Sequence, residues 1–161
     1  MTMVDKIISS IQAVHGEDFK VYYHDDPTLN LMTSEMEFPC ALLLLLSQGQ
    51  AVNIGGAIRE RVSAAVFFVE KQADFDFDAI QNEQTIDRCK RRALAWLASL
   101  PASDMVELAA EARTSRVYQR YDDILTGYGV QADLIEVEGF TGCPSVDGDF
   151  NNDFNGDFLV A

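Results

Sequence analysis

Residues Ile58–Lys71 read IRERVSAAVFFVEK and carry the clearest structural pattern of the chain. Its apolar residues alternate between two faces, with Val62, Ala64, Val66 and Phe68 on one and Phe67 and Val69 on the other. Alternation with a period of two is typical of a β-strand. The stretch begins with the charged residues 59–61. We therefore predict a long strand that enters a sheet from a solvated end.

A second strand is predicted directly before it. Phe38–Leu46 is an almost continuous apolar run, with Pro39 near its start and Gln48-Gly49-Gln50 after it. Five leucines in a row have a high helix propensity, but the run is shorter than ten residues. A strand covered on both faces fits better. Gly55-Gly56 then supplies a loop between the two strands.

Two segments have helical spacing. In residues 3–15 the apolar positions follow i, i+3, i+4 and i+7, Thr2 and Asp5 form a capping-box pattern, and Gly16 is a natural stop. The second helix is expected from about Ala79 to Leu100, with Asp78 or Asn82 as its N-cap and Pro101 after its end.

The other segments are shorter. Lys20–His24 is a strand candidate, and residues 102–112 could hold either a short helix or a strand over Met105–Leu108. Residues 116–121 and 130–134 are expected to form an antiparallel pair, separated by Gly127-Tyr128-Gly129.

These elements together predict an α+β fold. A mostly antiparallel sheet of about four to five strands would pack against two main helices. Residues 1–140 would form one domain. Residues 141–161 would form an acidic tail of Gly, Asn, Asp and Phe that is flexible or becomes ordered on a partner.

The charge is strongly acidic, at −14 from 12 Lys and Arg against 26 Asp and Glu. No Lys or Arg follows Arg120. Specific nucleic-acid binding is not expected, because contacts with phosphates require cations. The apolar run at 41–46 is too short to span a bilayer, and three cysteines without a CxxC pattern suit a reducing cytosol.

Candidate sites for chemistry are weak. A calcium-loop pattern places possible ligands at Asn151, Asp153, Asn155 and Asp157, but the chain ends before the glutamate that such a loop needs. His24 with Asp25 and Asp26, or Asp74 with Asp76 and Asp78, could hold a metal ion, although a polar turn and a solvated loop are the simpler interpretations. We predict no catalytic residue and no cofactor.

Candidate interface residues are arginines and tyrosines, which are favoured as anchors where proteins meet. The alternatives are a solvated helix face for the arginines and ordinary strand packing for the tyrosines. The candidates are Arg59, Arg61, Arg88, Arg91, Arg92, Tyr118, Tyr121 and Tyr128.

The order of elements over residues 3–138 resembles the tail-terminator (tail-completion) proteins of long-tailed bacteriophages. The similar features are the arginine-led strand 59–71, the segment 75–78 leading into the helix with Trp96, and a closing region that begins at Tyr121-Asp122-Asp123 and ends at Ile135–Glu138. Other head–tail joining proteins are similar in size and style.

The resemblance implies a non-enzymatic structural protein of the virion, found in the host cytoplasm before assembly. It would form a homo-oligomeric ring, usually of six copies, that caps the tail tube and contacts other neck and tail proteins. Two alternatives remain open at this stage. One is a small acidic binding module or inhibitor, and the other is a metal-dependent enzyme that uses Asp74, Asp76 and His24.

Overall fold

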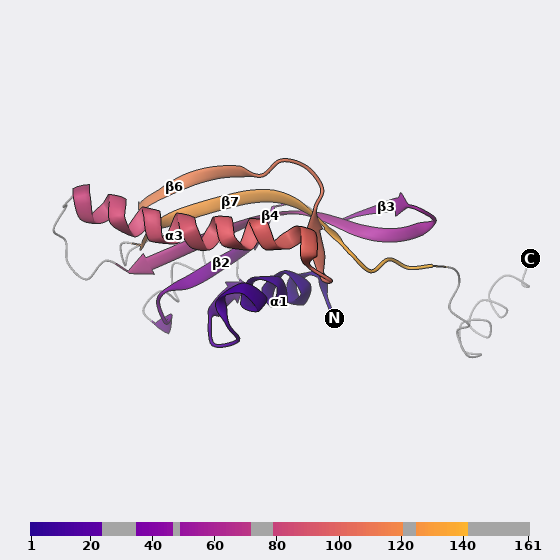
Figure 1. Cartoon of the computed structure of the whole chain (residues 1–161), viewed down its shortest axis with the longest axis horizontal. Coiled ribbons are helices and arrows are strands. Elements are labelled where there is room, and N and C mark those ends of the chain that lie inside the picture. Colours follow the sequence, from indigo (N-terminus) through magenta and orange to yellow (C-terminus); the bar gives the residue numbers. More distant parts are fainter. Residues whose placement is uncertain (24–34, 47–48, 72–78, 121–124, 142–161) are drawn as a thin grey trace, which may run out of the picture.

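A computed structural model describes residues 1–23, 35–46, 49–71, 79–120 and 125–141 of the chain. Two α-helices, α1 (Met3–His15) and α3 (Ala79–Ser99), pack on one face of a seven-stranded sheet (Figure 1). The strands are β1 (Lys20–Tyr23), β2 (Cys40–Leu45), β3 (Gln50–Ile54), β4 (Ala57–Lys71), β5 (Val106–Leu108), β6 (Arg113–Arg120) and β7 (Leu125–Glu136). The predicted α+β class is confirmed, with more strands than expected.

The long strand β4 organises the sheet. One of its edges pairs with β7, and its other edge pairs with β2 over residues 64–69 and with β3 over residues 57–61. Strands β5 and β6 lie along the far edge of β7. All of these pairs are antiparallel, and only β1 runs parallel to its neighbour, β2.

The main core lies between the sheet and the two helices. The predicted inner row of β4, from Val62 to Phe68, packs there against Ile7 and Ile11 of α1 and Trp96 of α3. A smaller cluster on the other face contains Cys40, Leu42 and Val69. Strand β2 contributes to both clusters, which confirms that it is covered on both faces.

The ends of the helices follow from local chemistry. Thr2 and Asp5 form the predicted capping box, and Gly16 ends α1 with a φ of 99°. Helix α3 begins at Ala79, so Asn82 lies inside it and is not its N-cap. A short 3₁₀ helix, η2 (Leu100–Ala102), closes α3 at Pro101. In residues 102–112 the strand alternative is correct, because Val106–Leu108 pairs with β7.

A buried hydrogen bond joins the two helices. The indole Nε1 of Trp96 donates to Ser10 Oγ at 2.9 Å, and Ser10 Oγ donates to the carbonyl of Ile7 at 2.7 Å. Both side chains are buried. Since an unpaired indole N–H is costly in a core, this contact fixes how α1 lies against α3.

The predicted break at residues 127–129 is wrong, because these residues lie inside β7. A Cβ on Gly127 would stand 1.9 Å from the carbonyl oxygen of Phe68 in β4, and one on Gly129 would stand 2.7 Å from the ring of Phe67. These glycines therefore permit a close approach between strands, which is a recognised role of glycine within a sheet.

Strand β3 was not predicted from the sequence. Gly55 and Gly56 join β3 to β4, with φ values of 62° and 85°. Positive φ at both positions is typical of the two-residue hairpin turn. Gly55-Gly56 is therefore the tip of a hairpin, not a loop between β2 and β4 as expected from the sequence.

Candidate subunit interface

The β3–β4 hairpin extends beyond the part of the sheet that the helices cover (Figure 1). A third segment pairs with it, because Ile58 N–H donates to the carbonyl of Phe140 at 3.0 Å and Phe140 N–H donates to the carbonyl of Ile58 at 2.7 Å. We call residues 50–61 together with Phe140 the arm. The arm consists largely of backbone pairing and has little core of its own.

One face of the arm is exposed and carries both apolar and polar side chains. The register places Asn53 opposite Ile58 and Ala51 opposite Glu60, so these side chains share a face. Ile58 exposes 44% of its surface and Phe140 exposes 59%. These two residues border a hollow of about 420 Å³ that is also lined by Gly49, Ala51, Glu60 and Glu136.

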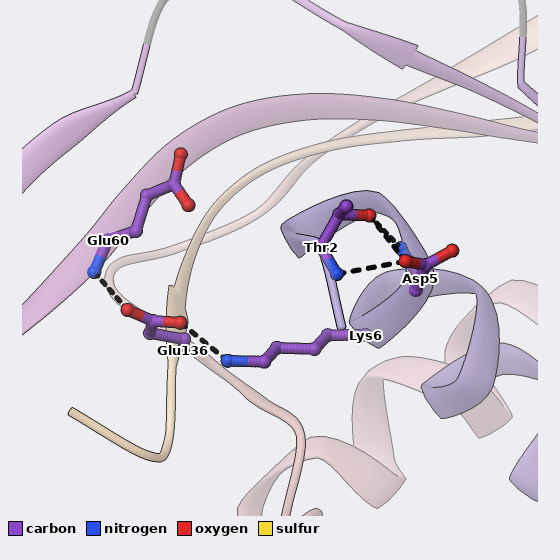
Figure 2. Close-up of polar contacts among 5 residues, drawn as sticks. All are labelled: Thr2, Asp5, Lys6, Glu60 and Glu136. Carbon is purple, nitrogen blue, oxygen red and sulfur yellow. Dashed lines mark hydrogen bonds and ion pairs between the residues drawn. The ribbon is translucent and has the colours of Figure 1, made fainter. Parts of the chain in front are cut away.

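The arm is anchored to α1 through Glu136. The amide of Glu60 donates to Glu136 Oε1 at 2.8 Å, and Lys6 Nζ donates to Glu136 Oε2 at 2.5 Å (Figure 2). Burial alone would raise the pKa of Glu136, but the hydrogen bonds from Lys6 and Glu60 and the nearby positive charges lower it on balance. One carboxylate thus joins β7, β4 and α1.

The carboxylate of Glu60 itself points away from Glu136 (Figure 2). Within the described parts of the chain, no cation pairs with it. The exposed face of the arm therefore carries one negative charge that no cation of the described chain compensates.

Two of the predicted arginines support the sheet from its other face. Arg59 Nη1 lies 3.4 Å from Glu107 Oε1, and Arg61 Nη2 lies 2.6 Å from Asp133 Oδ2. Ser63 Oγ also donates to Asp133, and these hydrogen bonds with the charge of Arg61 lower the pKa of Asp133. Both arginines therefore have partners within the chain.

The arginines of α3 divide into two groups. Arg88 Nε lies 3.0 Å from Glu70 Oε2 and Arg92 Nη1 lies 3.7 Å from Glu70 Oε1, so both bind the helix to β4. The sequence placed them on a solvated face together with Arg91, and for Arg92, which is only 26% exposed, this is wrong. Arg91 is 81% exposed, and among the described residues it pairs with Asp87 of its own helix, at 2.9 Å.

Of the three predicted interface tyrosines, only Tyr128 has a side chain in the described part of the chain. Tyr128 is partly buried and packs against the main core. Tyr121 and the side chain of Tyr118 lie outside the described part of the chain.

Cys40, Cys89 and His15, which could in principle act as nucleophiles or a base, pack against other residues of the protein. Burial raises the pKa of Cys40 and that of Cys89 to about 12, so neither thiol is activated. His15 Nε2 donates to the carbonyl of Arg92 at 3.0 Å, its ring packs against Phe68, and burial lowers its pKa.

The proposed metal ligands lie outside the described residues. They are His24, Asp25, Asp26, Asp74, Asp76, Asp78, Asn151, Asp153, Asn155 and Asp157. Within the residues that the structure does describe, no group of three His, Cys, Asp or Glu side chains is placed to hold a metal ion.

Sequence reasoning missed the arm because its residues are not strongly patterned. Nothing in the sequence pairs Phe140 with Ile58, 82 positions away. The signal that could have revealed the hairpin was Gly55-Gly56 between two short runs of alternating residues.

No protein-family model matches this chain, and no curated protein is significantly similar to it. Neither α1 nor α3, the α-helices of the described part of the chain, has the length and apolar character needed to pass through a lipid bilayer.

Proposed function

We propose that the chain is a structural, non-enzymatic subunit of a homo-oligomeric ring at the tail–neck junction of a bacteriophage. The observation that carries the proposal is the arm, which projects from the core and exposes Ile58 and Phe140 together. Exposed apolar side chains in a contiguous hollow are typical of surfaces that become covered by another protein. The resemblance of the element order to tail-terminator proteins supplies the virion context.

The ionic contacts of the chain favour assembly over the alternative of an acidic inhibitor. Such an inhibitor needs carboxylates that are free to bind a basic partner. Six carboxylates of the described surface already pair with cations of the same chain, namely those of Glu70, Glu83, Asp87, Glu107, Asp133 and Glu136. These six are among 15 Asp and Glu residues in the described ranges, which also hold 12 Lys and Arg, so the described part carries only −3 of the net charge of −14 and lacks the broad acidic surplus that an inhibitor would need.

The ring is tested by the mass and shape of the purified full-length protein. Light scattering coupled to size-exclusion chromatography, from about 1 μM to 1 mM, covers the affinities expected for a specific assembly. We expect a single oligomer with closed rotational symmetry in electron-microscopic class averages. A protein that stays monomeric over the whole range, also with a crowding agent, would overturn the ring.

The location is tested separately. Antibodies against the chain should label the junction between head and tail on phage particles from the strain that carries its gene. Particles that contain no label, although the protein is present in the lysate, would contradict a virion role even if the protein forms rings.

A further inference from the structure

Three of the nine large hydrophobic residues that are exposed in the described chain, Ile58, Phe140 and Ile80, border hollows at two separate places. One is the arm. The other is the N-terminal half of α3, where Ile80 is 70% exposed and borders a hollow of about 510 Å³ lined also by Gln84, Asp87 and Arg91. The arm and the N-terminal end of α3 lie at opposite ends of the long axis of the molecule (Figure 1).

We propose that the arm of one copy docks onto the N-terminal half of α3 of the next copy. The inference rests on the proposed ring and names the two surfaces that meet in it. Two different surfaces at opposite ends produce a heterologous, head-to-tail contact, which closes into a ring when the rotation between copies allows it. Ile58 and Phe140 of the arm would cover Ile80, the apolar residue in the lining of the hollow on α3.

The two surfaces offer one complementary pair of charges, although Glu83 and Asp87 also line the hollow of α3, beside Arg88 and Arg91. The arm presents Glu60, whose carboxylate has no cation within the described chain, and α3 presents Lys90 and Arg91. The pair between Arg91 and Asp87 is exposed and joins positions four apart on one helix, so it is weak and can be exchanged for a new partner. An interface would thus pair Glu60 with Arg91.

The acidic tail of the chain itself is a poor occupant of the arm's hollow, although it follows directly after Thr141. Residues 142–161 contain four aspartates and no Lys or Arg. The hollow already contains Glu60, whose carboxylate has no cation within the described chain, beside Glu136, which pairs with Lys6, and Arg59, which pairs with Glu107. Like charges brought together in an interface oppose binding, so a surface that carries cations is favoured instead.

Cysteine cross-linking distinguishes this contact from others. In a Cys143→Ser background, Ile58→Cys and Gln84→Cys are made separately, mixed and mildly oxidised. A disulfide requires the two Cβ atoms to lie about 3.5–4.5 Å apart. We expect a covalent dimer from the mixture, covalent multimers from a chain that carries both cysteines, and little product from either variant alone. The control Glu17→Cys, mixed with Ile58→Cys, should give none.

The other outcomes overturn the inference. Efficient dimers of Ile58→Cys alone would mean that two arms meet each other. No product from the mixture, with rings still seen by light scattering, would remove this contact and leave the proposed ring intact. A wild-type chain that is monomeric would overturn both.

Charge exchange gives an independent measurement in the full-length protein. Glu60→Arg and Arg91→Glu should each weaken assembly about tenfold, by replacing an attraction with a repulsion. Combining both changes in one chain should restore it, because every copy supplies both surfaces. The pairing would be contradicted if the losses of assembly affinity in the two single variants simply added in the double variant. The circular dichroism of all variants must be unchanged for this comparison.

Discussion

Ile58 and Phe140 exchange both of their backbone hydrogen bonds, at 3.0 and 2.7 Å, and so tie the end of the described chain to the β3–β4 hairpin near its tip. Gly139 makes this possible, since a Cβ there would stand 2.7 Å from Arg59 Cγ and 2.8 Å from Ala57 Cβ. The pairing of Phe140 with Ile58 therefore depends on Gly139, which precedes Phe140 and has no side chain.

We therefore expect Gly139→Val to release residues 139–141 from β4. The amide of Ile58 should exchange with deuterium about tenfold faster or more, as the local opening becomes easier. Core amides such as that of Val66 should keep their rates. Thr141→Val is the matched control, and faster exchange at Ile58 in that variant too would argue against the role of Gly139.

Ser10→Ala should destabilise the protein by about 1–3 kcal/mol, because it leaves the buried indole N–H of Trp96 without a partner. Urea unfolding, followed by the fluorescence of this single tryptophan, measures the loss. Ser9→Ala, one position earlier on a less buried part of α1, should change the free energy of unfolding by about 0.5 kcal/mol or less. Equal effects of the two substitutions would contradict this account.

The two glycines of β7 should differ in their tolerance of a methyl group. At Gly127 the added atom meets the backbone of Phe68, which cannot move without separating β4 from β7. At Gly129 it meets the ring of Phe67 and the hydroxyl of Ser115, which can rotate. We expect Gly127→Ala to cost about 2 kcal/mol or more and Gly129→Ala to cost less. Thermal melts of both variants test the order, and the reverse order would refute the assignment.

Glu136 should contribute to the acid sensitivity of the fold. Its pKa is lower in the folded protein than the ordinary value of 4.5, so it stabilises the folded state above that pH. The contribution is lost as the pH falls below 4.5 through the folded pKa.

Glu136→Gln should therefore flatten the decline of stability between neutral and acidic pH. Urea unfolding at a series of pH values measures it, with the exposed Glu138→Gln as the control. A decline in Glu136→Gln as steep as in the wild type would show that Lys6 and Glu60 do not hold this carboxylate in solution.

Cys40 and Cys89 should be unreactive in the folded protein, because both are buried and burial raises the pKa of each to about 12. In the Cys143→Ser variant, a thiol reagent at neutral pH should label neither cysteine until denaturant is added. Rapid labelling of either one in native buffer would mean that the sheet opens around it.

The strongly patterned elements could be predicted from the sequence. Three predictions from local sequence patterns are confirmed. They are the inner apolar row of β4, the burial of β2 on both faces and the capping box of α1. Strand β3 of the arm was missed, because Gln50–Ile54 is only partly buried and is held mainly by its pairing with β4, and the Gly55-Gly56 turn was the signal that could have revealed it. Burial patterns carry little information about such a strand.

The arginines illustrate the same limit. Arg88 and Arg91 are three positions apart in one helix, yet only Arg88 faces Glu70 of β4. Periodicity assigns both residues to the polar side of α3. Which of them meets the sheet depends on how the helix is rotated against a strand that precedes it in the chain, and this is tertiary information.

The arrangement of β2 and β3 along one edge of β4 has a consequence for evolution. Because β3 pairs only with residues 57–61, the hairpin can gain or lose residues in pairs while every side chain between 64 and 69 keeps its neighbours. The reach of the projection can thus be retuned by small insertions and deletions near Gly55-Gly56, while the packed body of the molecule is inherited unchanged.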